Sequence, residues 1–343
     1  MEKQHNLISE GNAAFVIPFW SDGKAHRKNY LNYALESIYK QTDKRWCIYI
    51  IDDNSPCRED KEYLQELHKN DSRIKVIFSD ENLGPGAARN KGIKQAFQDG
   101  CVFICFLDSD DIAHKMRVEK AREVFCNDPD TAVVYSTFTI IDEDNQDVPF
   151  DNLIEGIKVI LNDMENSPLE GYDVWIKVAT ERDNLTIPSS LNVRTNLAYL
   201  NPFPEYARFH EDTHTWLRYS ASGAKIRYAP NIPSLYRVPQ KLRGSESRER
   251  AGGIEEFNRL RGKTIIKGLD DAINLALNRG VIDMDKSLEI KTRFCLNVAS
   301  LIKKEGTDKV AKELIQQAKQ FSIKHFNLFK DKYDLKDILT DEL

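Results

Sequence analysis

The most informative stretch of the chain is Cys101-Val102-Phe103-Ile104-Cys105-Phe106-Leu107-Asp108-Ser109-Asp110-Asp111, an apolar run that ends on three carboxylates in four positions. An unbroken apolar run predicts a strand that is buried on both faces. In parallel α/β sheets, ligands bind just beyond the carboxyl ends of such strands. Carboxylates this close repel one another unless a cation or basic side chains neutralise them, so the stretch predicts an oxygen-ligated Mg2+ or Mn2+ site. The alternative is an acidic turn that caps a helix.

Short apolar runs alternate with helical periodicity from Ala13 to Ser136, which is the pattern of repeated βαβ units. We therefore predict an α/β fold with a Rossmann-like, mainly parallel sheet flanked by helices. Residues 151–188 are expected to form an insertion that shapes a substrate pocket. The remaining periodicity is helical, so we predict one domain at residues 1–240 and a helical C-terminal region at residues 241–343. Strands are expected at residues 13–17, 46–51, 74–78, 101–107 and 132–141, and helices at residues 87–97 and 116–125.

The composition limits the class of protein. The chain has 343 residues, of which 41% are hydrophobic and 30% charged, as in soluble globular proteins of about two domains. A formal net charge of −5 argues against nucleic acid as a partner. Six scattered cysteines suggest reduced thiols rather than a disulfide framework. Because no stretch approaches the roughly 20 apolar residues that span a bilayer, we expect a cytoplasmic protein, at most peripheral at the inner face of the membrane.

A glycine-rich segment, Gly84 to Gly92, links the third predicted strand to a helix. It resembles a dinucleotide-binding turn, but Arg89 stands where the third glycine of that motif belongs, and the strand before it is the third rather than the first. We therefore expect a turn that directs Arg89 and Asn90 towards a nucleotide. A plain connection between loop and helix is the alternative.

The segment His210-Glu211-Asp212-Thr213-His214 matches the zinc-protease pattern H-E-x-x-H. The extended pattern requires a glycine and a third histidine, whereas Leu217 and Ser220 occupy those positions. A downstream glutamate is the other source of a third ligand, but no acid occurs between Thr213 and Ser245. Glu211 and Asp212 then form an acidic pair at a helix start, either as caps or as a carboxylate base facing a cleft.

Taken in order, these motifs resemble the inverting family 2 glycosyltransferases of the GT-A fold, over roughly Ala13 to Arg237. The matching segments are Val16-Ile17-Pro18, Ile51-Asp52-Asp53-Asn54-Ser55, Asn82-Leu83-Gly84, Ala88-Arg89-Asn90-Lys91-Gly92, Leu107-Asp108-Ser109-Asp110-Asp111, Glu211-Asp212 and Tyr236-Arg237.

The resemblance implies metal-dependent transfer of a hexose from a nucleoside diphosphate sugar, with UDP-sugars favoured, to a hydroxyl of a saccharide, a lipid-linked glycan (glycolipid) or a protein. It implies that Asp53 binds the nucleotide base and that Asp110 ligates Mn2+ or Mg2+. Asp108 is assigned to the same metal and to the donor's ribose or sugar. Asp212, with Glu211 beside it, is implied as the general base. Further donor contacts are expected at Pro18, Gly86, Arg89, Asn90, Ser109 and Arg237.

Two features depart from that pattern. Relatives often continue the Tyr-Arg motif with a histidine, whereas Val238-Pro239-Gln240 follows here, so Lys241 or Arg243 is expected to replace that contact. The helical tail lies outside the resemblance. It is interpreted as plain core, as a homodimer or acceptor-presenting module, or as an amphipathic surface near a membrane-bound acceptor.

Two other functions remain open from the sequence. A sugar-nucleotide nucleotidyltransferase would also place a metal on an α/β sheet, but residues 19–24 lack the basic glycine-rich loop that would hold a triphosphate. An inactive GT-A scaffold is disfavoured because Asp53, Asp110 and Asp212 are all present.

Overall fold

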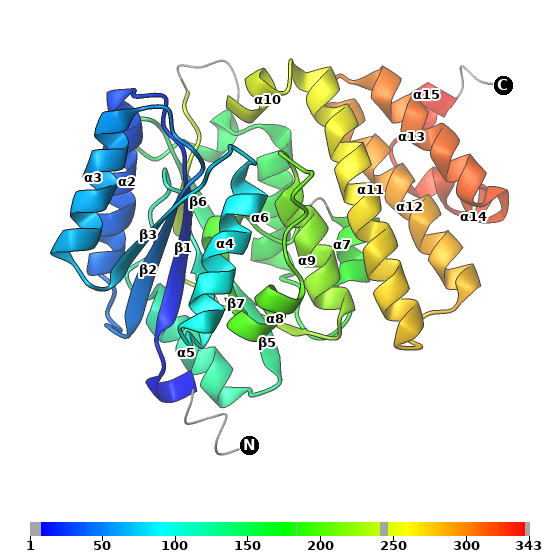
Figure 1. The fold of residues 1–343 in the computed structure, drawn as a ribbon. Helices are drawn as coiled ribbons and strands as arrows, with labels where there is room; N and C mark the ends of the chain where they lie inside the picture. Colours follow the sequence, from blue (N-terminus) through cyan, green and yellow to red (C-terminus); the bar gives the residue numbers. More distant parts are fainter. Residues whose placement is uncertain (1–7, 183, 241–245, 340–343) are drawn as a thin grey trace.

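A computed structural model describes residues 8–182, 184–240 and 246–339. Its centre is a seven-stranded sheet with strand order β3-β2-β1-β4-β7-β5-β8 (Figure 1). All neighbouring pairs are parallel except those of β7, which runs antiparallel to β4 and β5. The predicted mainly parallel α/β sheet is therefore confirmed. The strands are β1 (Ala13–Phe19), β2 (Trp46–Asp52), β3 (Ile74–Phe78), β4 (Phe103–Phe106), β5 (Thr131–Tyr135), β7 (Leu191–Arg194) and β8 (Lys225–Tyr228).

Alternate residues of each strand divide the core between the two faces of the sheet. In β1, Ala13, Phe15 and Ile17 belong to one buried cluster and Ala14 and Val16 to another. The first cluster is covered by α2 (Ala25–Tyr39), α3 (Arg58–Asn70) and α5 (Arg117–Asn127), whereas the second is covered by α4 (Pro85–Gln98) and α9 (Glu211–Ala221).

Helix α4 lies unusually close to the sheet. A Cβ atom added to Gly92 would lie 2.6 Å from Val16 Cγ1 and 2.7 Å from Ile51 Cδ1, so only glycine permits this approach. The helix begins at Pro85, directly after Gly84, whose φ of +93° suits glycine. This packing brings the start of α4 to the edge where β1, β2 and β4 end.

A second, two-stranded sheet crosses beside the first. Strand β6 (Phe138–Ile141) pairs in parallel with β9 (Ser234–Arg237), although the predicted strand at residues 132–141 was expected to be continuous. The backbones of Ile112 and Leu235 exchange hydrogen bonds of 3.0 and 2.8 Å. Strand β9 is thereby held beneath the loop that follows β4.

The insertion at residues 151–188 is mostly helical. It contains α6 (Glu155–Asn166) and α7 (Trp175–Glu181), and a 3-10 turn at Pro188–Ser190 leads into β7. Helix α8 (Thr195–Leu200) then leads into an irregular segment of turns and bends, residues 201–210, that precedes α9.

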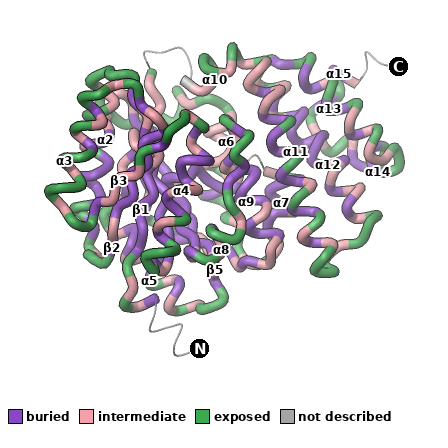
Figure 2. Tube along the Cα trace, viewed as in Figure 1, coloured by how far each residue is buried: buried purple, intermediate pink, exposed green. Residues whose placement is uncertain are grey.

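The C-terminal part is helical, as predicted from its periodicity. Its hydrophobic residues belong to the same buried cluster as Ala14 and Val16, so the core continues without interruption from the sheet into these helices (Figures 1 and 2). A division near residue 240 stays a prediction. The helices are α10 (Glu246–Arg250), α11 (Ile254–Asn278), α12 (Met284–Lys304), α13 (Asp308–Phe321), α14 (Ile323–Phe329) and α15 (Lys336–Leu339).

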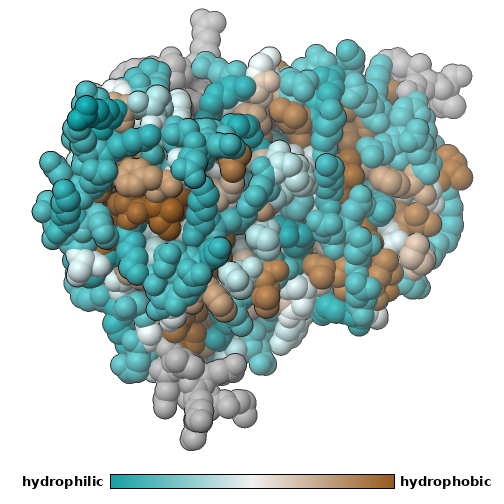
Figure 3. Space-filling view, in the orientation of Figure 1, coloured by the Kyte–Doolittle hydropathy of each residue, from teal (hydrophilic) through white to brown (hydrophobic). Residues whose placement is uncertain are grey.

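The face of the molecule seen in Figure 3 is mostly hydrophilic, with separate hydrophobic areas, some of them over the C-terminal helices. Within the described residues, none of the helices combines the length and hydropathy needed to cross a bilayer.

Candidate active site

The carboxyl ends of β1, β2 and β4 meet at one edge of the sheet. Phe19, at the end of β1, pairs with Asp52 at the end of β2, and the N–H of Asp53 donates to the carbonyl of Phe19 at 2.8 Å. Pro18, half-buried, faces Ile51 in the same register. The predicted site residues that follow these strands are therefore neighbours in space, as the topology requires.

Asp53 organises the loop that precedes α4. Its side chain is buried, and its carboxylate accepts hydrogen bonds from the N–H of Leu83 at 3.0 Å and of Gly84 at 2.8 Å. The Asn82 side chain donates to the carbonyl of Asp53 at 3.0 Å. These bonds join the two motifs after β2 and β3. The predicted contact of Asp53 with a nucleotide base stays a prediction.

Of the three carboxylates after β4, two are partly exposed to solvent and one is buried. Asp111 is 1% exposed, and it accepts hydrogen bonds from the hydroxyl of Ser189 and, at 2.9 Å, from the N–H of Arg237. Asp108 and Asp110 are half-buried, with Ser109 between them. The expected metal pair is Asp108 and Asp110, and Asp111 instead holds β9 and the Ser189 turn in place.

The carboxylates of Asp108 and Asp110 suit a divalent cation. Burial and the charge of Asp108 raise the pKa of Asp110 to about 6, a repulsion that a cation would relieve. Both are hard oxygen donors. Among the described residues no cluster of three or more His, Cys, Asp or Glu side chains forms a complete metal site. The two carboxylates would therefore suit a divalent cation, which would supply positive charge at this edge of the sheet.

Arg89 is a buried bridge rather than an exposed cation. It is 2% exposed, and its Nη2 lies 2.5 Å from Asp108 Oδ1 while its Nη1 lies 2.6 Å from Glu211 Oε1. We expected Arg89 to point towards the donor. In the structure its two terminal nitrogens are bound to protein carboxylates, and a direct donor contact stays a prediction.

The acidic pair lies at the start of α9, as predicted. Burial raises the pKa of Glu211 to about 7, although the neighbouring Arg89 opposes this shift. Asp212 is more exposed, and burial raises its pKa above the usual range. Its carboxylate accepts hydrogen bonds from the N–H of Thr213 at 2.7 Å and from the side chain of Asn184 at 3.3 Å. A partly open carboxylate with a raised pKa is suited to general-base chemistry.

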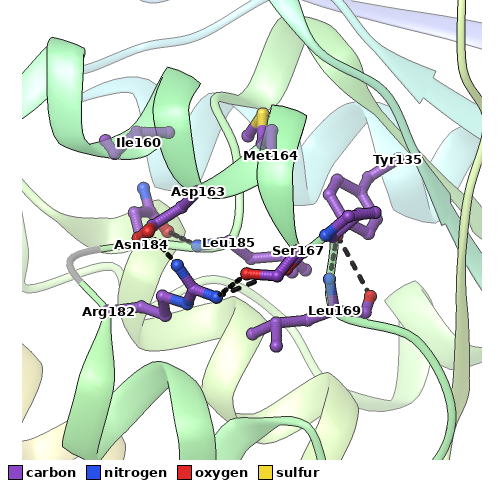
Figure 4. Close-up of a pocket in the computed structure, with 10 residues that line it drawn as sticks. Tyr135, Ile160, Asp163, Met164, Ser167, Leu169, Arg182, Asn184 and Leu185 are labelled. Atoms are coloured by element: carbon purple, nitrogen blue, oxygen red, sulfur yellow. Dashed lines mark hydrogen bonds and ion pairs between the residues drawn. The ribbon is translucent and has the colours of Figure 1, made fainter.

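Asn184 was not singled out by the sequence. Its Oδ1 accepts from the N–H of Leu185 at 2.8 Å, which turns its NH2 group towards Asp212. Asn184 also lines a pocket between α6 and β5, shown in Figure 4. The substrate role expected for the insertion stays a prediction. Arg182, which also lines this pocket, pairs with Asp163 and donates to Ser167.

The H-E-x-x-H match does not form a metal site. His214 is 2% exposed; its Nδ1 accepts from Arg218 Nε at 3.1 Å, and its Nε2 lies 3.0 Å from the hydroxyl of Tyr206. Glu211 points away to Arg89. The zinc-protease interpretation is thus excluded by the partners of these side chains.

Gly86 and Asn90 hold the segment before α9 against α4. A Cβ atom on Gly86 would lie 3.3 Å from Glu211 Cγ and from Phe203 Cβ. Asn90 donates to the carbonyl of Phe203 at 3.0 Å and accepts from its N–H at 2.8 Å. The motif expected to bind a donor therefore also positions the acidic pair.

Arg237 stabilises the loop that carries Asp110. It is 3% exposed, and its Nε donates to the carbonyl of Asp110 at 2.8 Å while its Nη2 donates to Asn145 at 2.6 Å. Its guanidinium carbon lies 4.1 Å from the centroid of the Tyr30 ring. The donor contact expected at Arg237 stays a prediction. Lys241 and Arg243 lie outside the described residues.

Comparison with known proteins identifies the class. The family described as glycosyl transferase family 2 matches residues 15–185, which include Asp53, Arg89, Asp108 and Asp110. Solved structures with the GT-A fold superpose on the sheet and its helices. Fold and site together define a glycosyltransferase of the GT-A fold, a transferase enzyme. The chain belongs to glycosyltransferase family 2.

Curated relatives share the same region. An uncharacterized glycosyltransferase of Methanocaldococcus jannaschii is 28% identical over 214 residues, which cover 62% of this chain and 68% of that protein. The putative teichuronic acid biosynthesis glycosyltransferase TuaG of Bacillus subtilis is 31% identical over 129 residues, 37% of this chain and 48% of TuaG. A glycosyltransferase of Rickettsia felis is 39% identical over 119 residues, 35% of this chain, but the match spans only 18% of that protein.

Structural likeness extends further along the chain than these sequence matches. Residues 1–349 of S. aureus TarS in complex with UDP align with a TM-score of 0.51 at 16% identity and cover 93% of this chain and 90% of that one. GalNAc-T7 with UDP, GalNAc and Mn2+ aligns with a TM-score of 0.52 at 16% identity, over 73% of this chain and 47% of that one.

Proposed function

We propose that the protein transfers a hexose from a nucleoside diphosphate sugar to an acceptor hydroxyl, with Mn2+ or Mg2+ and with inversion at the anomeric carbon. One observation carries the proposal: Arg89 contacts Asp108 at 2.5 Å and Glu211, the neighbour of Asp212, at 2.6 Å. The guanidinium of Arg89 thereby links the loop that carries Asp108 and Asp110 to the start of α9, where Asp212 follows Glu211. A displacement at a sugar carbon needs one acidic group on the side of the leaving group and another on the side of the attacking hydroxyl.

The leaving-group side is assigned to the loop after β4. Asp108 and Asp110 would hold the cation, which when bound supplies positive charge to neutralise the leaving diphosphate. Asp111 and Arg237 keep that loop in place through buried hydrogen bonds. These fixed contacts reduce the reorganisation required as charge develops.

The acceptor side is assigned to Asp212. Its carboxylate takes the proton of the attacking hydroxyl, and Asn184 and the N–H of Thr213 orient it for that step. A single attack opposite the leaving group inverts the anomeric centre, and one base on the acceptor side is sufficient for it. The start of α9 therefore has the chemistry that an inverting transferase needs.

A UDP-sugar is the donor we favour. TarS has been crystallised with UDP and with UDP-GlcNAc, and GalNAc-T7 with UDP, GalNAc and Mn2+, which supports a UDP-linked donor and a divalent metal here. Asp53 and Pro18 would line the nucleotide side of the site. The acceptor is proposed only as a class, the hydroxyl of a saccharide, glycolipid or protein.

A donor panel tests the proposal. The purified protein is incubated with UDP-, GDP- and dTDP-sugars with and without Mn2+, and release of the nucleoside diphosphate is measured, first alone and then with an acceptor library. We expect metal-dependent release from one nucleotide class. Pyrophosphate release from a nucleoside triphosphate and a sugar phosphate would instead favour a nucleotidyltransferase. Absence of binding and turnover with every donor would contradict the proposal and favour a scaffold.

A further inference from the structure

Helix α9, which begins with the acidic pair, packs against α11 of the C-terminal region (Figure 1). The contact leaves no space for a side chain at residue 268. A Cβ atom on Gly268 would lie 2.7 Å from His214 Cα, 2.8 Å from its Cγ and 2.9 Å from its Cδ2. Side-chain carbons do not approach so closely, so α11 reaches the backbone of α9 only because residue 268 is glycine.

The imidazole of His214 adds polar contacts to this close approach. Because Nδ1 accepts from Arg218, the ring carries its proton on Nε2, which faces the hydroxyl of Tyr206 at 3.0 Å. Nε2 also lies 3.7 Å from Asp271 Oδ2, one turn along α11 from Gly268. The Lys267 ammonium lies 4.4 Å from the centroid of the Tyr206 ring. The ring thus connects α9 both to α11 and to the segment that precedes α9.

The same turn of α9 carries the proposed base. Asp212 lies two residues before His214, and the N–H of His214 donates to the carbonyl of His210 at 3.2 Å, closing the first turn. On its other side α9 packs through Trp216, whose ring lies 5.8 Å from that of Phe106 in β4. Helix α9 is therefore held between the sheet and α11, and Asp212 lies in the same turn of α9 that contacts α11.

We propose that Gly268 and His214 are positioning residues and that α11 sets the position of Asp212 relative to the acceptor hydroxyl. The C-terminal helical region then contributes to the geometry of the active site through α11, in addition to any role in dimerisation or acceptor presentation. The inference rests on the proposed function for the role of Asp212. The contact between α9 and α11 stands independently of it.

The test compares two glycines of the same helix. Gly268→Ala introduces the clash with His214, whereas Gly262→Ala places its Cβ 3.6 Å from Leu314 Cδ2, an ordinary contact, and serves as the matched control. For Gly268→Ala we expect kcat for transfer to fall by about tenfold or more, since a misplacement of about 1 Å can cost two orders of magnitude. The donor KM should stay within about twofold. Gly268→Val should lose more, and Gly262→Ala should match the wild type.

A second readout does not depend on catalysis. Hydrogen exchange of the amides of residues 211–215 should become faster in Gly268→Ala and stay unchanged in Gly262→Ala. If Gly268→Ala does not fold, His214→Gln, which removes the ring contacts without adding volume, replaces it in both measurements. If Gly268→Ala has the kcat and the hydrogen exchange of the wild type, the inference is overturned. It is also overturned if this variant loses kcat, donor affinity and thermal stability to the same extent. A wild-type protein that is inactive with every donor would contradict the proposed function. Hydrogen exchange of residues 211–215 in Gly268→Ala would then show by itself whether α11 holds the start of α9.

Discussion

Arg89 Nη1 lies 2.6 Å from Glu211 Oε1, an ion pair between α4 and the first turn of α9 whose two residues are 122 positions apart in the chain. Both side chains are almost fully buried. Such a pair gains little over apolar residues of the same shape, but removing one partner leaves the other charged in a site of low dielectric. The pair therefore adds a buried electrostatic contact to the packing of Gly86 and Asn90 that already joins the two helices.

Replacing Arg89 should be costly for stability. In Arg89→Met, Glu211 and Asp108 lose their cation, so we expect the free energy of unfolding in urea to fall by about 3 to 5 kcal/mol. Arg89→Lys should recover only part of this, because an ammonium lacks the planar fork that reaches both carboxylates. The exposed Arg58, paired with Glu62, is the control: Arg58→Met should leave the free energy of unfolding almost unchanged. Equal effects at the two sites would contradict the prediction.

Asp212→Asn should remove the base and keep the donor site. General-base assistance contributes about two to four orders of magnitude in rate, so we expect kcat for transfer to fall in that range. UDP affinity, measured by calorimetry, should change less than about twofold. Asn184→Ala, which removes one hydrogen bond to Asp212, should cause a smaller loss of kcat. Near-normal transfer by Asp212→Asn would refute the assignment.

Metal dependence should separate Asp110 from Asp111. Treatment with EDTA should abolish transfer, and Mn2+ should restore it. Asp110→Asn should raise the Mn2+ concentration needed for half-maximal activity by about tenfold or more, since it removes one charged oxygen ligand. Asp111→Asn should instead lower thermal stability, because its carboxylate accepts from Ser189 and Arg237 inside the protein. Activity that persists in EDTA would exclude the metal role.

The stability contributed by His214 should depend on pH. Burial, with the charges of Arg218 and Lys267, lowers its pKa to about 3, although Asp271 lies 3.7 Å away. An unfolded histidine has a pKa of about 6.5, so below that pH the unfolded state binds a proton that the folded state does not. Stability is therefore fully present above about pH 6.5 and falls as the pH drops towards 3.

The comparison of wild type with His214→Gln isolates the titration of His214, because all other titratable groups are the same in the two proteins. The difference in free energy of unfolding between the two proteins should shrink by about 1.4 kcal/mol for each pH unit below 6.5. Urea titrations at pH 7.5, 6.0 and 5.0 measure it. A difference that does not change with pH would mean that the pKa of His214 is the same in the folded and the unfolded protein.

Apolar runs with few polar residues made the strands β1, β2 and β4 predictable, and their order along the chain made the shared edge predictable. Strand β7 could not be predicted in this way. Leu191–Arg194 is short, and it forms a strand by pairing with β4 on one side and β5 on the other. The predicted strand at residues 101–107 is shorter, Phe103–Phe106, because Cys101 and Val102 lie before the first β1 pair.

The acidic residues of the site were found from motifs, since carboxylates after strands have a recognisable context. Their partners were not. The bridge from Arg89 to Glu211 and the contact of Asn184 with Asp212 join segments that local patterns do not relate. Asp111 illustrates the same limit, because its neighbours in sequence are half-buried while it is enclosed by Ser189 and β9.

The parallel pairing of β6 with β9 also sets the timing of maturation during synthesis. The carboxylate of Asp111 finds the N–H of Arg237 only after 126 more residues have been added. At about 5 to 20 residues per second, translation needs roughly 6 to 25 s for that length. Throughout this interval the loop after β4 has no partner strand on the growing chain. A nascent polypeptide halted before β9 therefore carries every acidic motif and still lacks the strand that holds Asp111 at the proposed donor site.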